Sequence, residues 1–305
     1  MDYKERIFTW IVQHWFPEFF RPGRVPRFFD LSQRLGYHIL PVQYYSPIPD
    51  TREISEKVWE SQTEMVGLDT RDADQLNFLS NVIPLYLTEF DQFPREPSND
   101  PIVYFHENFT FVGADAVALY CMVRHNRPGH VIEVGSGMST RITAAALARN
   151  GCGELICIEP YPNETLKAHP GISSLLIQKV QEVDISLFEV LEDGDILFID
   201  TTHAIKTGGD VPYLFLEVLP RLKPGVRVQI HDIFLPRDYP RPWVLDFLMF
   251  SSEQYLVQAF LAFNSGYEFL FSSSYMTIRH RDAMEAQIGR YPRWDHGCSL
   301  WIKRV

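Results

Sequence analysis

Positive charge is in short supply in this sequence. The chain has 28 lysine and arginine residues against 39 aspartate and glutamate residues, and its formal net charge is −11 at pH 7. A protein that binds a phosphate backbone needs a basic face, so this balance argues against nucleic acid. We therefore expect no nucleic-acid partner.

Cysteine is scarce as well. The chain has 4 cysteines and no CxxC pair, and their spacing offers no disulfide framework. This usage is typical of a reducing compartment, so we expect a cytoplasmic protein with unpaired thiols in its core or on its surface. The residues are Cys121, Cys152, Cys157 and Cys298.

Long uninterrupted apolar runs are missing too. The aromatic-rich segment 7–20 is broken by Gln13, His14, Pro17 and Glu18. It is therefore neither a signal peptide nor a membrane span. Its apolar residues have helical spacing, which favours a docked or dimer-forming face over a membrane anchor. We expect this segment to form the contact of a homodimer.

The composition changes along the chain and predicts two domains. Residues 1–100 are expected to form an N-terminal helical and lid extension, and residues 101–305 the main domain. Residues 51–92 have helical spacing, and residues 93–101 resemble an acidic linker with prolines. Residues 21–50 are expected to be irregular because proline restricts the backbone. The residues on which this depends are Pro22, Gly23, Pro26, Pro41, Pro47 and Pro49.

From about residue 110 onward, helical stretches alternate with short apolar runs. This alternation predicts an α/β fold of the Rossmann-like, doubly wound kind, with a mostly parallel sheet of seven strands covered on both faces. The expected helices include 114–124 and 211–222. The expected strands are 131–134, 155–158, about 174–178, 195–199, 226–230, 267–271 and 299–303.

Glycines follow the first of these strands, in the segment HVIEVGSGMST at residues 130–140. Gly135 and Gly137 at a strand-to-helix turn allow a ligand to approach the backbone closely. Thr140 stands where a dinucleotide fingerprint needs a third small residue, which disfavours NAD. Glu159 ends the next strand, where a carboxylate can accept both ribose hydroxyls. The segment predicts a nucleotide-like cofactor.

Polar side chains follow two further strands. Asp200 and His203 come after one of them, and His231 and Asp232 come after the next. Neighbouring strands lie about 4.8 Å apart, so these groups can converge. Two carboxylates and two imidazoles suit a divalent metal or acid–base catalysis. Each residue alone also fits a helix cap, a turn or a structural hydrogen bond, but the four together favour function.

Five segments in order, EVGSG, ICIEP, DILFIDTTH, LKPG and IHDIF, resemble a class I S-adenosylmethionine-dependent methyltransferase with a family-24 type methyltransferase domain. They are also similar to the metal-dependent sugar O-methyltransferases. The resemblance covers about residues 100–305. It implies that Gly135, Ser136 and Gly137 form a loop that lines the methionine part of S-adenosylmethionine, and that Glu133 orders this loop. It also implies that Glu159 binds the ribose and that Asp184 contacts adenine.

The same resemblance implies a metal ligand at Asp200 and a general base at His203, from a D-x-x-H motif. The family places an acidic pair at the next strand end, but here His231 replaces the first acid and Asp232 remains. The implied metal ligands are therefore Asp200, His231 and Asp232, and the implied catalytic residues are His203, Asp200 and His231. This mixed set suits Mn²⁺, Fe²⁺ or Zn²⁺ better than Mg²⁺, and a site without metal is the alternative.

The function expected from these features is O-methylation of a small-molecule acceptor, such as a sugar or an aromatic ring. His203 would take the proton of the acceptor hydroxyl, and the methyl group would move in line from sulfur to oxygen. Three alternatives stay open. They are a non-haem metal-dependent hydroxylase, a non-catalytic cofactor-binding protein, and an NAD-dependent oxidoreductase, which Thr140 disfavours.

Overall fold

A computed structural model describes residues 2–21 and 24–305 of the chain. Packing divides the chain into two compact units, Met1–Ser55 and Glu56–Val305. Residues 56–100, which the sequence analysis assigned to the N-terminal extension, thus pack with the sheet. The role of residues 1–100 as an extension or lid stays a prediction. Among the described helices, none has the length and apolar character needed to cross a membrane.

The described residues of the first unit form three helices, α1 (Tyr3–His14), α2 (Phe16–Phe19) and α3 (Val25–Arg34). The prediction of irregular structure is wrong for α3, because Pro26 falls in its first turn, where the missing N–H breaks no helical hydrogen bond. Pro22 and Gly23 lie outside the described residues. Large apolar side chains of α1, including Phe8 and Trp10, are exposed. A dimer contact there stays a prediction.

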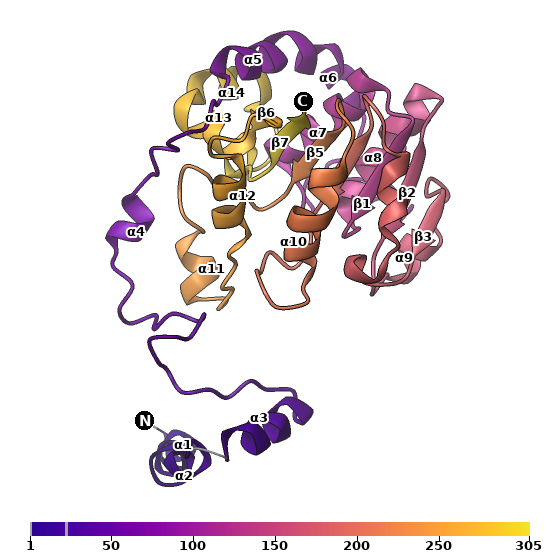
Figure 1. Ribbon diagram of the computed structural model, residues 1–305. Coiled ribbons are helices and arrows are strands. Elements are labelled where there is room, and N and C mark those ends of the chain that lie inside the picture. Colours follow the sequence, from indigo (N-terminus) through magenta and orange to yellow (C-terminus); the bar gives the residue numbers. More distant parts are fainter. Residues whose placement is uncertain (1, 22–23) are drawn as a thin grey trace. The chain divides into compact units, whose positions relative to one another are not determined.

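The second unit is built on one seven-stranded sheet with the order β3-β2-β1-β4-β5-β7-β6 and with helices on both faces (Figure 1). Pairing is parallel from β3 through β5, whereas β7 runs antiparallel to both β5 and β6. The predicted Rossmann-like, mostly parallel sheet is confirmed. The strands are β1 (His130–Val134), β2 (Glu154–Ile158), β3 (Ser174–Leu176), β4 (Ile196–Ile199), β5 (Arg227–Ile230), β6 (Tyr267–Ser272) and β7 (Leu300–Arg304).

Both predicted helices are present. The first is α7 (Gly113–Asn126), and the second is a continuous helical run over Asp210–Arg221 that ends before Lys223, Pro224 and Gly225. The remaining helices and helical turns are α4 (Lys57–Glu60), α5 (Asp72–Asn77), η1 (Phe78–Val82), η2 (Ile83–Leu85), α6 (Leu87–Phe90), α8 (Met138–Asn150), α9 (Glu164–Lys167), η3 (Val180–Glu182), η4 (Ile185–Val190), α10 (Asp210–Tyr213), η5 (Leu214–Val218), η6 (Leu219–Arg221), α11 (Arg241–Leu245), α12 (Glu253–Leu261), α13 (Ser273–Arg279), α14 (Arg281–Ile288) and η7 (Trp294–His296).

The central strands are apolar because they are buried on both faces. All four residues of β4 are buried, and so are the last three of β5. Parallel strands covered by helices need such continuous apolar runs. Polar residues can therefore appear only where these strands end, and β1, β2, β4 and β5 all end at the same edge of the sheet. This edge carries the candidate site.

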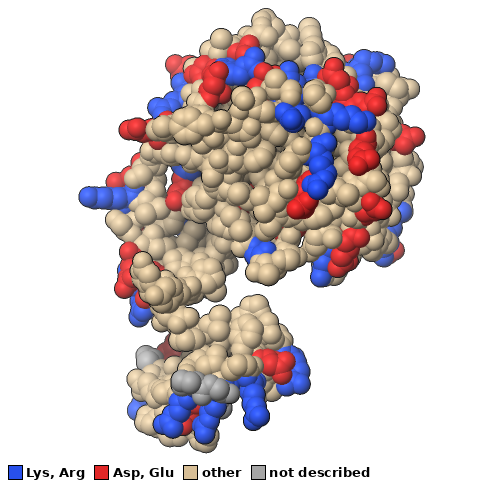
Figure 2. Space-filling model, viewed as in Figure 1, with Lys and Arg blue, Asp and Glu red and all other residues tan. Residues whose placement is uncertain are grey.

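Charged side chains of both signs are interspersed on the face of the sheet unit that Figure 2 shows. No continuous basic patch forms among the described residues on this face. The arrangement accords with the acidic balance of the whole chain.

Candidate active site

The two glycines after β1 have different structural roles. Gly135 has a φ of +81°, and a Cβ at this position would lie 1.7 Å from the backbone oxygen of Asp200. Only glycine fits there, because both the conformation and the space exclude a side chain. Gly137 does not have a positive φ, and nothing lies within 4 Å of the place its Cβ would take. Its amide donates to Thr140 Oγ1 at 2.9 Å, which fixes the start of α8.

Glu133 fixes the conformation of the loop Gly135–Gly137. Its side chain is fully buried on β1, and its Oε1 accepts hydrogen bonds from Ser139 Oγ at 2.6 Å and Thr140 Oγ1 at 2.8 Å. Burial raises the pKa of Glu133 to about 8, although these two hydroxyl groups oppose the shift. Thr140 thus links Glu133 to the amide of Gly137. A threonine in place of the third glycine of a dinucleotide fingerprint therefore has a structural reason.

We predict that stability falls as pH rises from 4.5 to 8, the ordinary and the raised pKa of Glu133. In this range the unfolded chain has released the proton and the folded chain still binds it, so the slope is negative, with a limit of about 1.4 kcal/mol per pH unit. Urea unfolding across this range measures the slope. Glu133→Gln should flatten it, and equal slopes in the two proteins would contradict the burial argument.

A cavity of about 500 Å³ opens where β1, β2 and β4 end. Glu159 lines it, and its carboxylate accepts from the amide of Ser136 at 3.3 Å and from the amide of Tyr161 at 2.8 Å. Gly135 and Asp200 also line this cavity. Gly137 lines a neighbouring cavity of about 190 Å³.

Asp184 lies outside both cavities. Its side chain is exposed and accepts a hydrogen bond from the amide of Ser186 at 3.0 Å, so it caps η4. Val180 and Gln181 of η3 line the larger cavity instead. These two residues could not be predicted from the sequence, since neither a valine nor a glutamine in a short turn indicates a ligand.

His203 is the centre of a buried polar cluster. Its Nε2 lies 3.2 Å from Asp200 Oδ1 and 3.2 Å from Asp232 Oδ2, while its Nδ1 lies 2.9 Å from Glu253 Oε2. Burial opposes a charge on this imidazole, but hydrogen bonds to Asp200 and Glu253 and the charge of Asp232 outweigh burial and raise the pKa of His203 to about 10. Both ring nitrogens therefore carry a proton at neutral pH in this arrangement, and the ring is positively charged.

His231 lies on the other side of the same carboxylates. Its Nδ1 is 3.6 Å from Asp200 Oδ2 and 3.4 Å from Asp232 Oδ1, and this buried nitrogen forms no hydrogen bond with any described residue. Its Nε2 lies 3.5 Å from Asp115 Oδ2. Burial disfavours the charged ring, but negative neighbours, among them Asp232 and Asp200, hold the pKa of His231 well above its usual range.

The predicted metal ligands are thus brought together. Asp200, His231 and Asp232 each offer a ligand atom, and these atoms lie within 4.8 Å of one another. The other nitrogen of each imidazole contacts a further buried carboxylate. His231 Nε2 contacts Asp115, and His203 Nδ1 contacts Glu253. Such a carboxylate fixes the orientation of a histidine whose other nitrogen faces a metal or a reacting group. The residues present therefore fit a divalent cation.

Three members of the cluster escaped the sequence analysis. Glu253 begins α12 and Cys298 precedes β7, and neither stands in a motif. Cys298 Sγ lies 3.2 Å from Asp232 Oδ1 and 3.7 Å from His231 Nε2. Asp115 did leave a signal, because it is a lone acid in the otherwise uncharged stretch 113–123, all of which is buried.

Two residues of the cluster have strained backbone conformations. The φ of His203 is +55° and that of Asp232 is +60°, in the left-handed region that side chains rarely adopt. Such conformations cost about 1–3 kcal/mol and persist where the surroundings enforce them. Here the carbonyl of His203 accepts from the amides of Ser252 at 2.8 Å and Glu253 at 3.1 Å. The tie to α12 holds both His203 and its carboxylate partner in place.

A family model described as a methyltransferase domain matches residues 132–233. An uncharacterized protein of Archaeoglobus fulgidus is 34% identical over 180 residues, which are 55% of this chain and 80% of that protein.

Solved structures with a similar fold include the SAH-bound methyltransferase PaMTH1 of Podospora anserina, at 12% identity, with 88% of this chain and 99% of that chain covered and a TM-score of 0.41. Another is an O-methyltransferase from Bacillus cereus in complex with SAH, at 13% identity, with 76% and 96% covered and a TM-score of 0.38.

Proposed function

Since this chain belongs to the class I S-adenosylmethionine-dependent methyltransferases, in the family described as a methyltransferase domain, we propose that it methylates a hydroxyl oxygen of a small-molecule acceptor. One observation carries the proposal. Asp200 lines the cavity of about 500 Å³, and its two oxygens face His203 at 3.2 Å and His231 at 3.6 Å. A cofactor in this cavity would thus lie beside groups that can activate a hydroxyl.

The cavity supports binding of S-adenosylmethionine through contacts of different kinds. Glu159 would accept the ribose hydroxyls, and the loop Gly135–Gly137, which Glu133 orders, would contact the methionine part. We assign the adenine contact to Val180 and Gln181, because both line the cavity and Asp184 is not among the lining residues.

The cluster supports a divalent cation held by Asp200, His231 and Asp232. When bound, such an ion supplies Lewis-acid polarisation that lowers the pKa of an acceptor hydroxyl. The imidazole nitrogen in this set suits Mn²⁺ or Fe²⁺ better than Mg²⁺, which prefers oxygen ligands only.

His203 is the proposed general base. Glu253 holds its Nδ1, so that Nε2 is directed toward Asp200 and Asp232. These two carboxylates keep the proton on Nε2 as the cluster stands. His203 can act as a base only in its neutral form, which it would reach when the charge of the two carboxylates is directed at another positive group. Methyl transfer is then a single in-line displacement from sulfur to oxygen, with no covalent intermediate on the protein.

Transfer of a deuterated methyl group from labelled S-adenosylmethionine tests this proposal. We expect O-methyl products from a panel of sugars, phenols and hydroxy acids, detected by mass spectrometry, with activity lost on chelation and restored by Mn²⁺. Asp200→Asn should lose the activity, and Asp193→Asn, at an exposed position before β4, should keep it. Methylation of amines or thiols alone would contradict the assignment to oxygen.

A metal-dependent hydroxylase is the second candidate. His203 Nε2 and His231 Nδ1 both face Asp200, which is the two-histidine, one-carboxylate set that non-haem iron uses. Product formation that depends on dissolved oxygen and not on S-adenosylmethionine would favour this candidate over methyl transfer.

A further inference from the structure

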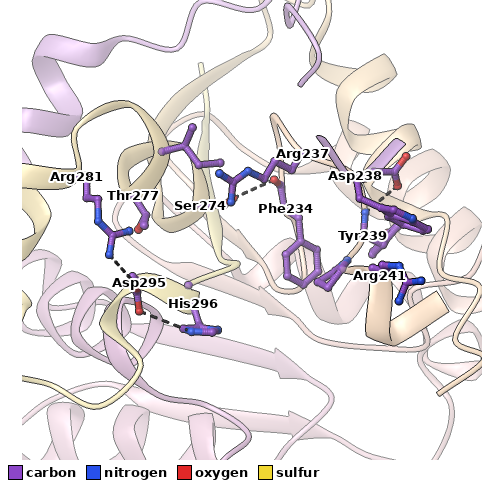
Figure 3. Close-up of a pocket in the computed structure, with 14 residues that line it drawn as sticks. Phe234, Arg237, Asp238, Tyr239, Arg241, Ser274, Thr277, Arg281, Asp295 and His296 are labelled. Carbon is purple, nitrogen blue, oxygen red and sulfur yellow. Dashed lines mark hydrogen bonds and ion pairs between the residues drawn. The ribbon is translucent and has the colours of Figure 1, made fainter. Parts of the chain in front are cut away.

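A second cavity, of about 590 Å³, lies between the loop 234–241, helix α13 and the residues before β7 (Figure 3). We propose that this cavity binds the acceptor and that the acceptor carries a carboxylate or phosphate group on a ring. That the ligand is the methyl acceptor rests on the proposed function. That the cavity recognises a ring-bearing oxyanion rests on the cavity alone.

The cavity adjoins the carboxylate–imidazole cluster. Phe234, which lines it, follows Asp232 by two residues. Gly297 also lines it and directly precedes Cys298, whose Sγ is 3.2 Å from Asp232 Oδ1. Two lining residues are thus close in sequence to members of the cluster, and the proposal requires that an acceptor seated in this cavity reach the cluster with its hydroxyl.

Arginine gathers at this cavity although the chain as a whole is acidic. Arg237, Arg241 and Arg281 line it. Arg281 is paired with Asp295 at 2.9 Å, and Arg241 with Glu56 at 3.4 Å.

Arg237 differs from the other two arginines, because its guanidinium forms no hydrogen bond or ion pair with any residue that the structure describes. The nearby carboxylate of Asp238 already accepts from the hydroxyl of Tyr255 at 2.6 Å and the amide of Tyr239 at 2.7 Å. A free guanidinium fork is the side chain best matched to a carboxylate or phosphate.

Two buried polar atoms in the cavity lining point to a ligand as well. Thr277 is 8% exposed, and its Oγ1 has no hydrogen-bond partner among the described residues. The indole nitrogen of Trp59 is also buried without a partner. Buried polar groups are nearly always hydrogen-bonded, so each orphan calls for a partner. Oxygen atoms of a bound acceptor would satisfy both the indole N–H and the hydroxyl.

Aromatic rings complete the site. Phe234 lines the cavity and packs edge-on against Trp243, with ring centroids 5.1 Å apart, and against Tyr239 at 5.8 Å. Such a wall receives the face of a planar or sugar ring. Arginines, unpartnered donors and an aromatic wall together specify a ring with an anionic substituent.

Calorimetric titration of the full-length protein with benzoate, phenyl phosphate and benzamide tests the site. Benzamide has the shape of benzoate without its charge. Both anions should bind, and benzamide should bind at least about tenfold more weakly. Arg237→Gln should weaken both anions by about tenfold or more and leave the affinity for S-adenosylmethionine unchanged. The ratio of the affinities for phenyl phosphate and benzoate shows whether the site prefers a phosphate or a carboxylate.

Arg279→Gln is the matched control, since Arg279 is an exposed arginine of α13 outside the cavity lining. It should bind the anions as the unmodified protein does. The proposal is overturned if neither anion binds, if benzamide binds equally well, or if Arg237→Gln and Arg279→Gln behave alike. A protein that binds phenyl phosphate but no S-adenosylmethionine would instead overturn the proposed methyl transfer and leave the oxyanion site standing.

Discussion

His203→Gln should lose methyl transfer by about 100- to 10,000-fold, the range that a positioned acid–base group contributes. The amide keeps the approximate size of the ring but cannot take a proton from the acceptor. S-adenosylmethionine should still bind, because His203 is not among the residues that line the cofactor cavity. The measurement is the initial rate of transfer from labelled cofactor, together with a binding titration on the same preparation.

The control for this prediction is His280→Gln. His280 Nε2 lies 2.8 Å from Asp72 Oδ2, so it is also a carboxylate-paired imidazole, but it belongs to the connection between α13 and α14. Its replacement should leave the rate unchanged. If His203→Gln keeps the full rate, His203 is structural and the proposed base is wrong.

Gly135→Ala should destabilise the protein and abolish cofactor binding. A left-handed conformation costs a non-glycine residue about 1–2 kcal/mol. At Gly135 the new methyl group would also lie 1.7 Å from the carbonyl oxygen of Asp200, a distance that the backbone must move to relieve. We expect a loss of at least about 3 kcal/mol in the free energy of unfolding, because strain and overpacking add. Urea unfolding and calorimetry measure the two effects.

Gly151→Ala separates the two causes. Gly151 ends α8 with a φ of +69°, but nothing lies within 4 Å of the place of its Cβ. Its replacement should cost only the conformational part, about 1 kcal/mol, and should leave cofactor binding intact. Equal losses at the two positions would show that the contact with Asp200 does not matter.

The strands and their polar ends were predictable because they depend on local patterns. Buried parallel strands need continuous apolar runs, and a change to polar residues marks where each run ends. The loop at Gly135 was visible for the same reason, since tight turns demand specific residue types. The same local reasoning failed at Val25–Arg34. The prolines predicted irregular structure there, but a helix tolerates proline in its first turn.

The groups that support the cluster were not predictable in this way. Glu253 lies 50 residues from the histidine that it contacts, and Cys298 lies 67 residues from His231. Their roles arise from tertiary packing, which no local spacing reports. Asp115 could have been found, since burial of a lone acid in an apolar helix requires a partner. Asp184 was placed by resemblance alone, and its exposed side chain caps η4.

Titration of S-adenosylmethionine into the metal-stripped protein, repeated with Mg²⁺ and Mn²⁺, shows whether the cavity beside Gly135 and Glu159 binds this cofactor. We expect micromolar binding of one molecule per chain. Binding should be lost in Glu159→Ala, directly after β2, and kept in Glu154→Ala, which alters the exposed first residue of β2. NAD should not bind. Absence of S-adenosylmethionine binding under every metal condition, or equal binding by the two variants, would contradict the assignment of the cofactor cavity.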